Sequence, residues 1–140
     1  MKVSEIMSKP VMTVLLDDLL LDVKEIFDQK KIRHILVIEE NKLFGVISER
    51  DLLRAISPHL QTHVYTPRDV ATLNKRVHQS MTRKPIFLRQ DAAISDAINL
   101  FKTQRIGCIP VVDDKDVPVG IITRGDILKN FDEICAVYSQ

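Results

Sequence analysis

The sequence has no tryptophan, few cysteines and glycines, and almost no net charge. Twenty lysines and arginines against nineteen acids give +1, which argues against a protein held on nucleic acid or membrane surfaces by bulk electrostatics. Four glycines and six prolines exclude collagen-like and low-complexity chains. The hydrophobic share of 45% and charged share of 28% are ordinary for a globular protein, and 140 residues suffice for one domain with a core.

The two cysteines and the first apolar stretch exclude further classes of protein. Cys108 and Cys135 are too few for a disulfide framework and lack the spacing of a zinc site, so we expect two buried thiols in a reducing compartment. The apolar stretch Val11–Leu16 is broken by Thr13 and followed by two acids, unlike a signal peptide or a membrane span. The sequence therefore predicts a soluble, cytoplasmic protein.

The chain repeats itself with an offset of about 75 residues. LFGVISERDLL, which starts at Leu43, is matched by PVGIITRGDIL, which starts at Pro118. LLDVKEIFDQKKIRHILVIEE from Leu20 is matched by ISDAINLFKTQRIGCIPVVDD from Ile94, and MSKP at residues 7–10 is echoed by MTRKP at residues 81–85. Three matched blocks in the same order indicate a tandem duplication, here called copy one and copy two.

Each copy predicts a β-α-β-β-α pattern. Short extended pieces at 11–15 and 86–88 precede amphipathic helices, whose apolar residues recur at helical spacing from Leu20 and from Ile94. Apolar runs of strand length follow, at 35–38 and 43–47 in copy one and at 109–112 and 117–122 in copy two. A final helix is expected to begin at Ser48 or at Thr123. The fold class is therefore α/β (α+β).

The stretch between the copies predicts an ordered connector. Pro58 should end the helix that begins at Ser48, and Thr66 to Asp69 carry the signals of a new helix start. Continuous apolar strands imply covered sheets, so we expect the copies to pack sheet to sheet about a pseudo-two-fold axis. The expected organisation is a first motif at 1–56, a connector with a short helix at 57–76, a second motif at 77–132 and a tail at 133–140.

Two segments carry a family resemblance. GVISERDLL and GIITRGDIL fit a signature of glycine, hydrophobic residue, any residue, Ser/Thr, two further residues and Asp, and RHILVIEE and GCIPVVDD fit the preceding strand. In these segments the chain resembles cystathionine-β-synthase (CBS) motifs, and over residues 1–130 it resembles a tandem CBS pair, called a Bateman module. The resemblance implies a regulatory signal-transduction module that binds an adenosine-containing ligand such as AMP, ADP, ATP or S-adenosylmethionine in clefts between the motifs. It also implies a homodimer. No cofactor is expected to be required, and the output is expected to be an effector protein or a change in self-association.

Ser48 and Asp51, and their counterparts Thr123 and Asp126, allow two interpretations. A Ser/Thr followed three positions later by an acid caps a helix, a contribution of about 1 kcal/mol that needs no ligand. The same helix start suits a phosphate, and a carboxylate one turn in can accept hydrogen bonds from ribose hydroxyls. The interpretations are compatible, and with the resemblance they predict ligand contact at both pairs.

Basic residues predict that the two sites differ. Arg33 and His34 enter the second strand of copy one and are candidate phosphate contacts, although a solvated strand end with a half-buried histidine is the alternative. Copy two has glycine and cysteine at the matching positions. Arg50 and Arg124, beside the signature serine and threonine, are further candidate ligand contacts. The two sites therefore cannot be chemically equivalent.

Three other patterns bear on function. The stretch 74–85 carries four basic residues and no acid, which indicates a solvated face or, as an alternative, weak nucleic-acid binding without aromatic residues for base stacking. His59 and His63 lack a third ligand, so no metal site is predicted. No nucleophile elbow, glycine-rich phosphate loop or HExxH motif occurs, so no catalytic residue and no enzyme are predicted. A ligand-binding regulatory module is the main prediction, a ligand-independent assembly scaffold the first alternative and nucleic-acid binding the second.

Overall fold

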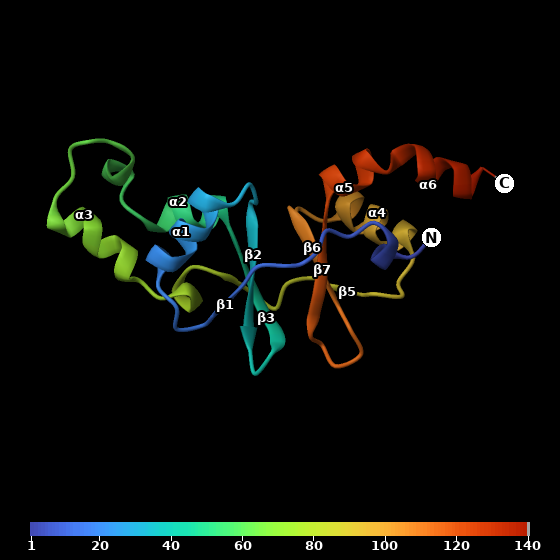
Figure 1. The fold of residues 1–140 in the computed structure, drawn as a ribbon, viewed down its shortest axis with the longest axis horizontal. Coiled ribbons are helices and arrows are strands. Elements are labelled where there is room, and N and C mark those ends of the chain that lie inside the picture. Colours follow the sequence, from blue (N-terminus) through green and yellow to red (C-terminus); the bar gives the residue numbers. More distant parts are fainter. Residues whose placement is uncertain (140) are drawn as a thin grey trace. The chain divides into compact units, whose positions relative to one another are not determined.

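The structure, a computed structural model that describes residues 1–139, consists of two compact units (Figure 1). The copy-one unit comprises Met12–Glu40 and Phe44–Lys84. The copy-two unit comprises Met1–Val11, Asn41–Leu43 and the chain from Pro85 onward. The copy-one unit is therefore nearly continuous in the sequence, whereas the copy-two unit draws on segments that are far apart.

The copy-one unit is built on a four-stranded sheet with the order β1-β2-β3-β4. Its strands are β1 (Thr13–Leu15), β2 (His34–Glu39), β3 (Lys42–Ser48) and β4 (Thr82–Arg83). Strand β1 runs parallel to β2, and β4 runs antiparallel to β3. Helices α1 (Leu20–Gln29) and α2 (Glu49–Ala55) pack side by side, as Figure 1 shows. The branched and apolar residues of the strands and the apolar face of α1 form the core, which includes Leu20, Val23, Ile35, Val37 and Ile47.

The connector forms short helical pieces within this unit. Helix α2 ends at Ala55, ahead of Pro58, and α3 (Pro67–Ala71) begins at the predicted position, with Thr66 as its N-cap. Three 3-10 turns, η2 (Pro58–Gln61), η3 (Thr72–Asn74) and η4 (Val77–Gln79), complete it. Asp69 joins two of these pieces, because it accepts hydrogen bonds from the Thr66 N–H (2.8 Å) and the Ser57 hydroxyl (2.7 Å). These bonds, the Thr66 N–H first, lower the pKa of Asp69.

The copy-two unit has a three-stranded sheet with the order β5-β6-β7. Its strands are β5 (Leu88–Arg89), β6 (Cys108–Val112) and β7 (Pro118–Thr123), and its helices are α4 (Ile94–Thr103), α5 (Arg124–Lys129) and α6 (Phe131–Tyr138). Strand β5 runs parallel to β6, which pairs antiparallel with β7. The core is made by Ile94, Ala97, Ile109 and Ile122, together with Val3 from the N-terminal turn η1 (Val3–Glu5).

Each unit contains the segment that precedes the other copy. Ser8 forms a two-bond bridge with Ile121 in β7, while Thr82 in β4 pairs with Val46 in β3, the position that matches Ile121. The close approach of these segments depends on glycine. A Cβ on Gly45 would lie 2.7 Å from the Met81 sulfur and 2.9 Å from the Thr82 carbonyl oxygen. The repeat of these two segments is visible in the sequence, but where each of them packs was not predicted.

The mixed α/β class with two small sheets is confirmed, and three local features differ from expectation. Strand β4 was not predicted, and helix α6 occupies most of the expected tail. Cys108 is buried as predicted, whereas Cys135 is exposed on α6 because the buried face of this helix is formed by Ile134. Within residues 1–139 no helix is both long enough and apolar enough to cross a membrane. The packing of the two copies on each other stays a prediction.

Candidate functional site

The copy-one site is organised by the junction of β3 and α2. Ser48 ends the strand and caps the helix: the Asp51 N–H donates to Ser48 Oγ (3.0 Å), and the Ser48 N–H donates to Asp51 Oδ2 (2.8 Å). The capping interpretation is therefore confirmed for this pair. The reciprocal bonds fix the Asp51 side chain through one oxygen, and among residues 1–139 its Oδ1 accepts no hydrogen bond. That oxygen is available to a ligand.

The start of β2 lies beside this junction. The Glu49 N–H donates to the Arg33 carbonyl oxygen (2.9 Å), which brings the Arg33–His34 pair to the first turn of α2. Burial lowers the pKa of His34, because the imidazolium loses hydration. The Asp51 carboxylate opposes this effect and Arg33 adds to it. The structure thus brings Arg33, His34, Ser48 and Asp51 together, while Arg50 is exposed on the same turn.

The lowered pKa of His34 predicts a pH-dependent stability. The unfolded chain binds a proton at this imidazole near pH 6.5, whereas the folded chain binds it only at lower pH. The free energy of unfolding therefore decreases as the pH falls below about 6.5. The contribution is fully present above that pH. Chemical denaturation between pH 7.5 and 5 should show a free energy of unfolding that falls with acidification by up to about 1.4 kcal/mol per pH unit from this group.

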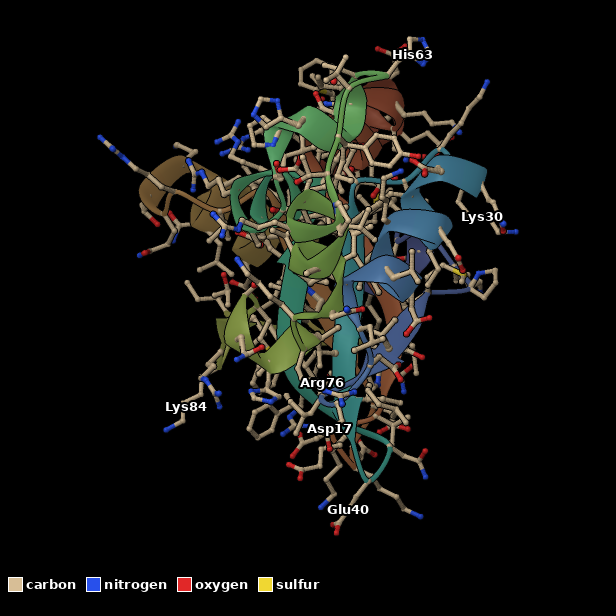
Figure 2. All side chains as sticks on the ribbon, turned by 90° about the vertical axis from the view of Figure 1, so that its left-hand side faces the viewer. Asp17, Lys30, Glu40, His63, Arg76 and Lys84 are labelled. Carbon is tan, nitrogen blue, oxygen red and sulfur yellow. The ribbon has the colours of Figure 1, made fainter. Side chains whose placement is uncertain are left out.

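His34→Gln should flatten that dependence. The matched control is His63→Gln, because His63 is exposed in the connector, where Figure 2 shows its ring projecting outward. A slope that is unchanged in His34→Gln would contradict the assignment.

A shallow hollow of about 200 Å³ adjoins the copy-one site. Asp51, Arg54, Ala55 and Ser80 line it. Arg54 and Ser80 were not among the predicted site residues. Arg54 could have been found, since it lies one helical turn after Asp51, whereas Ser80 carries no local signal because it reaches the site only through the fold. A carboxylate, a guanidinium and a hydroxyl thus line the same hollow.

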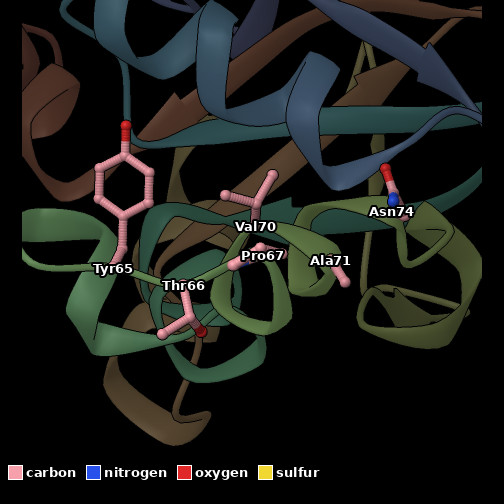
Figure 3. Close-up of a pocket in the computed structure, with 6 residues that line it drawn as sticks. All are labelled: Tyr65, Thr66, Pro67, Val70, Ala71 and Asn74. Carbon is pink, nitrogen blue, oxygen red and sulfur yellow. The ribbon is translucent and has the colours of Figure 1, made fainter.

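A larger hollow, of about 390 Å³, lies in the connector. Figure 3 shows its lining, which is Tyr65, Thr66, Pro67, Val70, Ala71 and Asn74. None of these side chains is charged, and none belongs to the predicted site. A phosphate would find no cation among them, so the chemistry favours the smaller hollow at Asp51.

The copy-two site has the same cap with a different environment. The Thr123 N–H (2.9 Å) and hydroxyl (3.2 Å) both donate to Asp126 Oδ2, and the Asp126 N–H approaches Thr123 Oγ1 at 3.4 Å. The Ser8 hydroxyl donates to Asp126 Oδ1 at 2.7 Å. The Arg124 guanidinium lies over the Phe101 ring, 5.2 Å from its centre. The structure thus places Thr123 and Asp126 together and adds Ser8, which sequence reasoning missed.

Three basic side chains of the stretch 74–85 donate hydrogen bonds to main-chain carbonyls of the copy-one unit. Lys75 donates to the carbonyl of Ala55 at the end of α2 (2.6 Å), and Arg76 donates to the carbonyl of Asp17 (2.8 Å), beside which Figure 2 shows it. Arg83 donates to a third main-chain carbonyl (3.3 Å). A cation at the carboxyl end of a helix also offsets its dipole. These three side chains are therefore more than a solvated face.

Comparison with known proteins agrees with this arrangement. The family model of the CBS domain matches the chain twice, over residues 3–58 and 75–133. Protein MJ1426 of Methanocaldococcus jannaschii is 33% identical, over 92% of this chain and 90% of its own length. Several other relatives are longer. An inosine-5′-monophosphate dehydrogenase from the same organism is 29% identical to the chain, which spans 23% of its length.

Solved structures of similar size share the fold. The CBS domain pair of protein MJ0100, solved with 5′-methylthioadenosine and S-adenosyl-L-methionine, is 29% identical with a TM-score of 0.74, over 95% of this chain and 97% of that one. CBSX2 in complex with AMP is also 29% identical, with a TM-score of 0.77 and the same coverage, and CBSX2 comes from Arabidopsis thaliana. With two family matches, matched caps and this fold, the chain belongs to the CBS domain family as a tandem pair.

Proposed function

We propose that this protein is a regulatory module that binds an adenosine-containing ligand at the copy-one site and passes that event to a partner protein or to its own association. Two relatives of the same fold were solved with such ligands, AMP in one and S-adenosylmethionine with methylthioadenosine in the other. The observation that carries the proposal is the Asp51 carboxylate, which is oriented by Ser48, open at one oxygen and adjacent to Arg33 and His34.

Each side chain has a defined task in this proposal. Asp51 Oδ1 accepts hydrogen bonds from the ribose hydroxyls, as acidic residues do in other nucleotide sites. Arg33 supplies the cation for a phosphate, because the lowered pKa of His34 keeps its imidazole neutral at pH 7. Neutral His34 can still donate or accept one hydrogen bond. This charge pattern favours a nucleotide over its nucleoside.

Regulation follows from differential affinity. A ligand shifts the protein toward whichever arrangement it binds more tightly, and only by that difference in binding free energy. Reversible binding of a ligand requires neither a catalytic group nor a cofactor, so the proposed role is regulatory. In this proposal, ligand binding changes either the association of the chain as a homodimer or its interaction with an effector protein.

A ligand-independent assembly scaffold is the second candidate function. It is favoured by one observation: both caps are complete without any ligand, so Asp51 and Asp126 already have a structural role. Nucleic-acid binding is not proposed, because Lys75, Arg76 and Arg83 are committed to carbonyl groups of the protein.

Thermal unfolding with AMP, adenosine and S-adenosylmethionine separates the two candidates. A ligand at 100 times its dissociation constant stabilises the folded state by about 2.7 kcal/mol, which raises the Tm of a protein of this size by roughly 5–15 °C. We expect a larger rise with AMP than with adenosine, because only AMP presents a phosphate to Arg33. No rise with any of the three at millimolar concentration would instead support the scaffold.

A further inference from the structure

The two signature carboxylates differ in how much of their hydrogen-bonding capacity is already used. A carboxylate offers about four lone-pair positions. Asp126 accepts three hydrogen bonds within the protein, two from Thr123 and one from the Ser8 hydroxyl. Among residues 1–139, Asp51 accepts one, from the Ser48 N–H. A ribose diol donates two hydrogen bonds, so Asp51 can accept both while Asp126 cannot.

The Ser8 hydroxyl is held in this position by the backbone. The Ser8 N–H donates to the Ile121 carbonyl (2.9 Å), and the Ile121 N–H donates to the Ser8 carbonyl (3.1 Å). Ile121 lies two residues before the Thr123 cap, so the bridge delivers the hydroxyl to the Asp126 carboxylate. A donor that is already positioned competes with a ligand without losing further conformational freedom.

The matched position in copy one does not do the same. Thr82 pairs with Val46 in β3 as Ser8 pairs with Ile121 in β7. Within the described part of the chain, Thr82 makes no hydrogen bond to Asp51. The two scaffolds are therefore equivalent, while the state of the carboxylate is not.

The surrounding charges favour the same site. Copy two has Gly107 and Cys108 where copy one has Arg33 and His34. Arg124, the cation closest in sequence to the copy-two cap, lies over the Phe101 ring. A phosphate at copy two would thus lack the counterpart of Arg33 and would have to draw Arg124 from its aromatic partner.

We infer that Ser8 is a built-in occupant of the copy-two site, so that one chain binds one adenosine-containing ligand, at Asp51, although the sequence repeats the signature twice. The inference rests on the proposed function. It makes Ser8 a specificity-determining residue that sets how many ligands bind.

Calorimetric titration with AMP, and in parallel with S-adenosylmethionine, measures this number directly. The wild-type protein should bind one ligand per chain. Ser8→Ala should bind two, because the freed Asp126 oxygen can then complete a diol pair, with a gain in affinity at copy two of about tenfold or more. Thr82→Ala is the matched control and should keep one site, as should Ser8→Thr, which retains the hydroxyl.

The outcomes distinguish the inference from the proposed function. Two sites in the wild-type protein, or one in a folded Ser8→Ala protein, overturn the inference alone. Should Ser8→Ala not fold, Asp51→Asn decides: binding that is weaker by about 10- to 100-fold, with no full-affinity site left, supports the inference, and a retained full-affinity site overturns it. No binding of either ligand by the wild-type and Ser8→Ala proteins overturns the proposed function.

Discussion

Asp51→Asn is expected to weaken AMP binding by roughly 10- to 100-fold. The substitution replaces a charged acceptor with a neutral amide that has one oxygen instead of two, and hydrogen bonds to an ionised acceptor contribute about 1.5–3 kcal/mol. The Asn oxygen can still accept from the Ser48 N–H, so the cap and the start of α2 should persist. Calorimetric titration of the purified variant gives the affinity, and circular dichroism checks the fold.

The connector supplies a control with the same substitution in the same local geometry. Asp69 occupies the third position of α3 and accepts from the N–H of its cap, Thr66, at 2.8 Å, as Asp51 does from Ser48. Asp69→Asn should therefore make the same change at an equivalent cap, which should likewise persist, without changing AMP affinity. Equal losses from the two substitutions would show that cap integrity, rather than contact with the ligand, governs binding.

Gly45→Ala should lower the free energy of unfolding by about 1–3 kcal/mol, the usual penalty for overpacking. The new methyl group would lie 2.9 Å from the Thr82 carbonyl oxygen, which belongs to the backbone of β4 and cannot turn away as a side chain can. Strand β4 must shift, and its pairing with β3 should weaken. Chemical denaturation measures the loss, and faster amide hydrogen exchange in β4 would locate it.

Two other glycines calibrate this expectation. At Gly120 the three atoms nearest to the added methyl group all belong to the flexible side chain of Met7, so Gly120→Ala should cost less than Gly45→Ala. At Gly125 the nearest atom, Thr123 Oγ1, would be 3.5 Å away, and alanine inside α5 should be neutral or stabilise by up to about 1 kcal/mol. An equal loss at all three positions would rule out crowding as the cause.

The parts of this fold that were predictable are those that a short local sequence pattern indicates. The strands at residues 34–39 and 108–112 follow from branched apolar runs, and the helices after Ser48 and Thr123 follow from a Ser/Thr with an acid three positions on. The duplication strengthened each assignment, because the same pattern occurs twice in the same order. Arg33, His34, Ser48 and Asp51 could likewise be named in advance, since they flank neighbouring ends of β2 and β3.

What escaped prediction depends on pairing across long separations. The Ser8–Asp126 hydrogen bond joins residues 118 positions apart, and β4 is only two residues long, so neither leaves a periodic signal. The roles of Lys75 and Arg76 escaped for a related reason. A run of cations resembles a solvated face until the fold brings the carbonyls of Ala55 and Asp17 within reach.

The crossing of the leading segments has a consequence for how such a chain could arise. The segment with Met81 and Thr82 precedes copy two but pairs with the sheet of copy one. In the same way, the segment with Met7 and Ser8 precedes copy one but pairs with Ile121 in copy two. A single ancestral copy would have needed the leading segment of a second molecule, which is a swapped dimer. Gene fusion would then convert a bimolecular exchange into one within a single chain. By the same reasoning, cutting the connector should yield two halves that each need the other in order to fold.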